Sequence, residues 1–103
     1  MERIERLGEF LKATPQDCFV KHALALEYIK QGDDGRAETQ FRELLQIDEN
    51  YIGSYYHLAK LLERTGTVEE AVGVYQKGME KAKAAGEDVG QDKLVEMMLE
   101  MTI

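Results

Sequence analysis

Apolar residues along the 103-residue chain recur at spacings of three, four and seven positions, and polar or charged residues fill the positions between them. These are the spacings that place side chains on one face of an α-helix. The pattern predicts helices over residues 2–12, 15–30, 34–47, 49–64, 68–84 and 91–101, with short connections between them. The sequence therefore predicts an all-α protein.

The pattern repeats after 34 residues. The positions that match at this offset are Leu24 with Leu58, Ala25 with Ala59, Tyr28 with Leu62, Lys30 with Arg64, Gly32 with Gly66, Ala37 with Ala71, Phe41 with Tyr75, and Leu45 with Met79. The repeated glycine is expected to end the first helix of each unit, because glycine readily adopts the left-handed conformation found at helix C-termini. Each unit therefore consists of two amphipathic helices joined at a glycine.

Side chains that can cap helix N-termini mark several of the predicted boundaries. Thr14 followed by Pro15 predicts a helix that begins at the proline, and Asp48, at the matching position, is expected to cap the next first helix. Asp33 and Thr67 are expected to cap the second helices.

A 34-residue helix–turn–helix with this order of Leu-Ala, Tyr or Leu, Gly, Ala, and Phe or Tyr resembles the tetratricopeptide repeat family, in particular its small bacterial members. The segment YIKQGDDGRAETQFRELLQID, residues 28–48, is especially close to the family pattern. The resemblance implies a right-handed helical solenoid of about six helices in a single domain. Its parts would be an N-terminal half repeat over 1–17, full repeats over 18–51 and 52–85, and a C-terminal capping helix over 86–103.

Two observations bear on this resemblance, one in support and one a departure. Leu7 and Phe10 are in register with the second helices of the repeats, which supports the half repeat. Lys21 stands where the family has a large apolar residue, so we expect Phe19 or Val20 to fill that space.

Charge, apolar content and cysteine count together limit the classes of partner and location that we expect. Acidic residues outnumber basic ones by 20 to 13, giving a net charge of −7 with no basic block, so nucleic acid is not expected as a partner. No apolar run approaches the roughly 20 residues that span a bilayer, and the first ten residues lack the apolar core of a signal peptide. A single cysteine cannot form an internal disulfide, and this suits a cytoplasmic protein.

The residues that could carry chemistry are few. Cys18 and His22 share a helix face, and His57 is expected on a neighbouring helix, so a metal site or a thiol nucleophile is one hypothesis. No recognised ligand spacing, phosphate loop or hydrolase motif accompanies them. We therefore expect no metal, no cofactor and no enzymatic activity.

The resemblance implies that the first helix of each repeat lines a concave groove that binds a peptide or protein segment. The residues expected on this face are Phe19, His22, Leu26, Ile29, Lys30, Tyr56, His57, Lys60 and Arg64. Some relatives bind a peptide carboxylate through lysine and asparagine here, but the matching places hold His22, Leu26 and His57, so that mode is not expected. The lysines and arginine instead favour a partner segment with apolar and acidic character.

The main hypothesis is thus a protein-interaction adaptor, and the alternative is a structural unit that forms a homodimer. The alternative rests on the last predicted helix, whose apolar residues cover about 200° of the helical wheel, more than one buried stripe requires. Met97 and Met101 are its candidate self-association residues. A metal or thiol enzyme is the third alternative.

Overall fold

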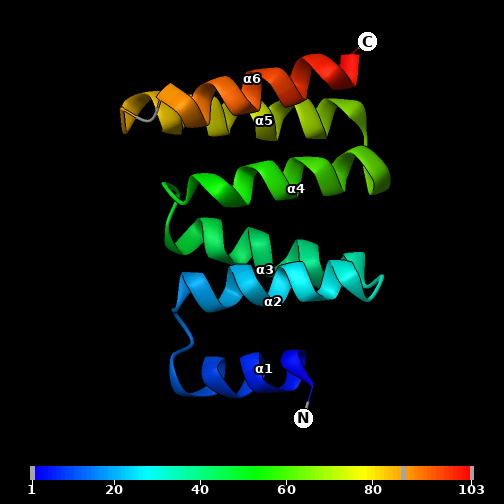
Figure 1. Ribbon diagram of the computed structural model, residues 1–103, viewed down its shortest axis with the longest axis vertical. Helices are drawn as coiled ribbons and strands as arrows, with labels where there is room; N and C mark the ends of the chain where they lie inside the picture. The colour runs from blue at the N-terminus through cyan, green and yellow to red at the C-terminus, as the bar shows by residue number, and fades with distance from the viewer. Residues whose placement is uncertain (1, 87, 103) are drawn as a thin grey trace. The chain divides into compact units, whose positions relative to one another are not determined.

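The computed structural model describes residues 2–86 and 88–102, and the side chains of residues 2–86 and 92–99. The described residues form six helices: α1 (Arg3–Ala13), α2 (Cys18–Lys30), α3 (Asp34–Ile47), α4 (Ile52–Thr65), α5 (Val68–Ala84) and α6 (Asp88–Thr102) (Figure 1). The all-α expectation is confirmed. Contacts divide the chain into two compact units, Met1–Glu49 with α1 to α3 and Asn50–Ile103 with α4 to α6.

The first unit is built on a hairpin of α2 and α3, which lie side by side and run in opposite directions, with α1 packed on α2 (Figure 1). Gly32 turns the chain between the two hairpin helices with φ 77°, the left-handed conformation expected for it. Asp33 then caps α3 by accepting a hydrogen bond from the Arg36 backbone N–H at 3.2 Å. Ala25 and Ala37 are fully buried, as expected for small residues that let two helices approach closely.

The second unit repeats the hairpin with α4 and α5, and α6 packs mainly along α5. Ala59, Ala71 and Tyr75 are fully buried, so the repeated positions form the core of this unit as well. Thr67 caps α5 through a hydrogen bond from the Glu70 N–H to its hydroxyl at 3.1 Å. Gly78 is also buried, because α5 lies so close to its neighbours that a Cβ there would stand 2.7 Å from Tyr55 Cβ.

The predicted starts of the first helices are wrong by three residues. The helix α2 begins at Cys18, because Asp17 caps it by accepting from the Val20 N–H at 3.0 Å. Thr14 instead ends α1, and its hydroxyl donates back to the Phe10 carbonyl at 2.9 Å. In the same way Asp48 ends α3 rather than capping α4, which begins at Ile52 without a side-chain cap.

Two further expectations need correction. Gly66 follows α4 with φ −116°, so it is not in the left-handed region. The space expected for Phe19 or Val20 is filled by Lys21 itself, which is 9% exposed, whereas Phe19 is 71% exposed. A lysine can be buried there because its apolar stem packs inside while its Nζ reaches Glu43 Oε2 at 3.6 Å.

Candidate functional site

A hollow of about 520 Å³ lies between α1 and α2 in the first unit. One wall is Arg3 of α1, and the other residues come from α2: Phe19, His22, Ala23, Leu26, Glu27 and Lys30. Four of the residues predicted to form a binding face, Phe19, His22, Leu26 and Lys30, therefore line one hollow. The fifth predicted residue of this helix, Ile29, is half-buried and is not part of the lining.

The hollow has an apolar centre. Ala23 forms a buried floor, Leu26 is half-buried, and Phe19 leaves 71% of its surface exposed at the first turn of α2. Because its ring is so exposed, Phe19 contributes little to the stability of the unit. It is, however, available to bury surface against a bound segment.

One edge of the hollow carries more positive than negative charge. Glu27 Oε1 accepts from Arg3 Nε at 2.9 Å and from Lys30 Nζ at 3.4 Å. Two cations thus share a single carboxylate, and each cation remains mostly exposed while the carboxylate is nearly buried. The edge attracts anions, in contrast to the net charge of −7 of the whole chain.

The His22 ring is held by packing against α3. Its ring stands edge-on to Phe41, with the centroids 5.8 Å apart and the planes at 67°. His22 therefore contributes a fixed aromatic wall to the hollow.

The other four predicted binding residues lie on α4 in the second unit. Tyr56 and His57 are half-buried, and Arg64 is exposed in the last turn. Lys60 Nζ lies 3.7 Å from Glu63 Oε2, a carboxylate that also accepts a hydrogen bond from the Tyr75 hydroxyl. Burial lowers the pKa of His57 below its ordinary value of 6.5, so this side chain is neutral at pH 7 and adds no charge to the face.

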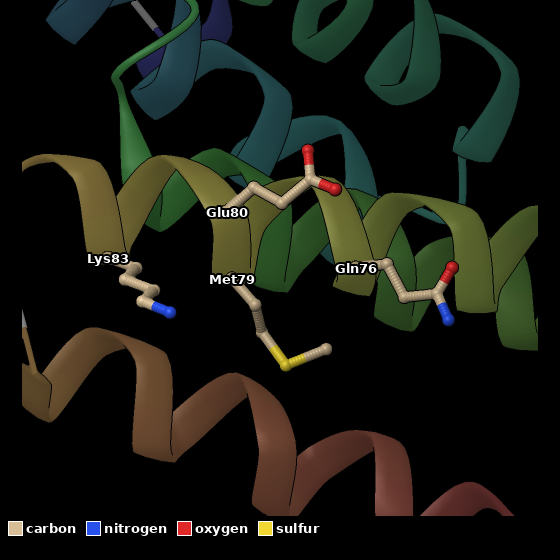
Figure 2. Close-up of a pocket in the computed structure, with 4 residues that line it drawn as sticks. All are labelled: Gln76, Met79, Glu80 and Lys83. Carbon is tan, nitrogen blue, oxygen red and sulfur yellow. The ribbon is translucent and has the colours of Figure 1, made fainter.

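A second hollow, which the sequence pattern did not indicate, lies on α5 and measures about 470 Å³. Its lining is Gln76, Met79, Glu80 and Lys83 (Figure 2). Figure 2 shows Met79 pointing from α5 toward α6, whereas Glu80 points to the opposite side of α5. The polar lining is mixed in charge, and it lacks an exposed apolar anchor of the kind that Phe19 provides.

The candidate self-association residues are on α6. Met97 is half-buried, and Met101 lies outside the residues whose side chains are described. Leu94, one turn before Met97, is fully buried beside Gly78 of α5. Leu94 is therefore used within its own unit, whereas Leu99 leaves 53% of its surface exposed.

The surroundings of Cys18 do not favour a thiolate. Burial and the carboxylates of Asp48 and Asp17 raise the pKa of the Cys18 thiol, so the thiol is protonated at neutral pH. Its sulfur lies 3.8 Å from the Gln16 carbonyl oxygen and 4.0 Å from the Leu44 carbonyl oxygen, the two acceptors within reach of its single S–H. Among the described residues, no three His, Cys, Asp or Glu side chains are grouped so that they could hold a metal ion. In the same part of the chain, no helix has the length and apolar character needed to cross a membrane.

Comparison with known proteins identifies the family to which this helical fold belongs. The tetratricopeptide repeat profile matches residues 20–51. A tetratricopeptide repeat domain protein from Salinibacter ruber, solved by NMR in solution, is 37% identical, with a TM-score of 0.80 over 84% of this chain and 88% of that one. This chain belongs to the tetratricopeptide repeat family.

Two further solved structures are similar to this chain. A crystal structure of a tetratricopeptide repeat domain protein from Salinibacter ruber is 36% identical, with a TM-score of 0.77 over 84% of this chain and 96% of that one. A protein from Bordetella parapertussis shares the fold, with a TM-score of 0.84 at 20% identity over 99% of this chain and 89% of that one. The comparison with curated proteins finds no match. Tetratricopeptide repeats generally act as protein–protein interaction modules and are typically not enzymes.

Proposed function

We propose that this tetratricopeptide protein binds a protein segment in the hollow between α1 and α2, and that the segment carries a large apolar side chain next to acidic residues. One observation carries the proposal: the exposed Phe19 ring shares its hollow with two cations, Arg3 and Lys30, that both pair with the single carboxylate of Glu27. The family's general role in protein binding supports it.

The apolar part of the segment would supply most of the affinity. Burying an exposed aromatic ring against another apolar side chain stabilises a complex by about 1–3 kcal/mol. His22 and Leu26 would form the walls around that contact. Because the contact area is small, we expect a dissociation constant in the micromolar range.

Arg3 and Lys30 would attract acidic residues that lie next to the apolar side chain of the bound segment. Pairs between exposed charges contribute about 0.2–1 kcal/mol each and weaken as salt increases. Ile29 beside the hollow is proposed as a further contact of this segment, and Tyr56, His57, Lys60 and Arg64 on α4 are proposed as binding residues of the second unit by itself.

A random peptide library displayed on phage tests this proposal directly. Selection on the immobilised wild-type protein should enrich peptides with an aromatic or large aliphatic residue flanked by Asp or Glu. The affinities of the enriched peptides are then measured by fluorescence anisotropy against Phe19→Ser, Lys30→Glu and Lys12→Glu. Lys12 is the matched control because it is also an exposed lysine in the last turn of a helix, but it does not line the hollow.

We expect Phe19→Ser to weaken binding about tenfold and Lys30→Glu about fivefold, with Lys12→Glu close to wild type. Equal affinities for the Lys30→Glu and Lys12→Glu variants would show that the hollow does not recognise the acidic residues of the peptide. Unchanged binding by Phe19→Ser would place the binding site elsewhere.

A further inference from the structure

The hollow between α1 and α2 has a fixed order of side chains along its length. Four of its lining residues recur at spacings of four, three and four positions and so form one row down α2: Phe19, Ala23, Leu26 and Lys30. The row is about 16 Å long, because a helix rises about 1.5 Å per residue. Ala23 is its smallest member and leaves a gap between Phe19 and Leu26. A large apolar side chain of a bound segment therefore fits over Ala23.

The positive charge of the hollow is concentrated at one level of this row. Arg3 Nε and Lys30 Nζ lie 2.9 Å and 3.4 Å from the same atom, Glu27 Oε1. These three side chains together carry one net positive charge. Glu27 follows Ala23 by four residues, which is about 6 Å along the helix axis. The attraction for an acidic group is therefore centred about one helical turn from the apolar gap.

The Phe19 end of the row offers no such attraction. Both cations of the described lining, Arg3 and Lys30, belong to the other end. Asp17, which caps α2, directly precedes the Phe19 turn and carries a negative charge there. Lys12 is exposed in the last turn of α1 and does not line the hollow. An acidic residue of a bound segment is therefore favoured on one side of the apolar gap only.

The size of the hollow favours an extended segment over a helix. Two turns of α-helix, about 10–12 Å across and about 11 Å long, fill at least about 850 Å³, more than the hollow of about 520 Å³ can hold. An extended chain advances about 3.3 Å per residue, and its side chains alternate between two faces. Residues two positions apart therefore face the same way at a separation of about 6.6 Å, which matches the distance from Ala23 to the level of Glu27.

Given the proposed function, on which this inference rests, we propose that the hollow binds its segment in an extended conformation, with the apolar side chain over Ala23 and an acidic residue two positions away, beside Arg3 and Lys30. Attraction by a positive edge without contact falls off only over about 8–10 Å at moderate salt, so it changes little when the acidic residue moves by one or two positions. A dependence of affinity on spacing therefore distinguishes contact from general attraction.

Peptides that contain tryptophan provide the test, because the chain itself has no tryptophan and the peptide indole alone then reports its own burial by fluorescence. Each probe is a short peptide with capped ends, a central tryptophan, one glutamate, and Gly, Ser and Gln elsewhere. The glutamate stands one, two, four or six positions from the tryptophan, in either direction, and a peptide with glutamine in its place is the reference. Each peptide is titrated with the wild-type protein up to about 1 mM.

Glutamate two positions from the tryptophan should strengthen binding about three- to fivefold over the reference peptide, and glutamate six positions away less than about twofold. A second glutamate, two positions away on the other side, should add no more than about twofold, because only one end of the hollow carries the cations. Strongest binding at four positions, which is the spacing of a helical segment, would overturn the proposal. Equal binding at every spacing, or an equal further gain from the second glutamate, would also overturn it.

Protein variants locate the contact. Arg3→Gln and Lys30→Gln should each reduce the advantage of the glutamate peptide, whereas Lys12→Gln, which removes the same charge outside the hollow, should keep it; the opposite result would refute the contact. The exposed side chains of all three residues predict folded variants, which circular dichroism verifies. If no peptide shifts the tryptophan fluorescence, or if Phe19→Ser binds as wild type does, the proposed function itself fails. Binding that depends on Phe19 but not on spacing overturns the extended arrangement alone.

Discussion

Replacing Gly78 by alanine tests the close packing of the second unit. A Cβ at this position would stand 2.7 Å from Tyr55 Cβ, 2.9 Å from Leu94 Cδ1 and 3.0 Å from Tyr55 Cγ. Such separations lie well inside van der Waals contact. Tyr55 Cβ is attached directly to the backbone of α4, so it cannot rotate away, and α5 must move relative to α4 and α6.

Two opposing effects determine the size of the change. Overpacking a tight contact costs about 1–3 kcal/mol, and here one methyl group meets two neighbours. Alanine stabilises a helix relative to glycine by about 1 kcal/mol. We therefore expect Gly78→Ala to lower the free energy of unfolding by up to about 2 kcal/mol.

The same helix provides a matched control. Gly73 is exposed, and a Cβ there would meet nothing within 4 Å, so Gly73→Ala should raise the free energy of unfolding by up to about 1 kcal/mol. Urea denaturation followed by circular dichroism compares the two variants with wild type. If Gly78→Ala is as stable as wild type or more stable, α5 does not approach α4 and α6 as closely as the structure has it. If Gly73→Ala is destabilised, the expected gain in helix propensity is wrong.

Two further predictions concern Lys21 and His57. Lys21→Met keeps the buried stem and removes a charge that is costly to bury, so its urea midpoint should equal or exceed that of wild type. Lys21→Ala removes the stem and should lower the free energy of unfolding by about 1–2 kcal/mol. Equal midpoints for the two variants would contradict the packing role of the stem. Because the pKa of His57 is lowered in the folded protein, the unfolded chain takes up its proton first as the pH falls below 6.5, and stability declines. Between about pH 7.5 and 5.5 this decline should be smaller in His57→Gln; an identical decline would show that burial of His57 is not its cause.

The sequence by itself determined the secondary structure, the pairing of helices into hairpins and the family. These features follow from local chemistry that repeats: apolar residues at helical spacing, alanines at Ala25 and Ala59, and capping side chains at Asp33 and Thr67. Hydrogen bonds between residues three or four apart form wherever the chain supplies them, so their partners can be recognised within a short segment.

Helix starts were less well determined because neighbouring residues compete for the same role. Thr14 and Asp17 are both able to cap α2. In the structure Asp17 caps α2, and the Thr14 hydroxyl bonds back to α1. The sequence pattern contains both candidates but not the choice between them, which depends on where α1 ends.

Only the tertiary structure decided which exposed residues line the same hollow. Arg3 and Glu27 are 24 positions apart, yet α1 and α2 bring them within 2.9 Å at the edge of the hollow. The need for glycine at position 78 likewise comes from Tyr55 and Leu94, on two other helices. Periodicity tells which face of a helix is apolar, but distances between helices depend on how side chains from separate segments pack, and that is settled only when the whole unit folds.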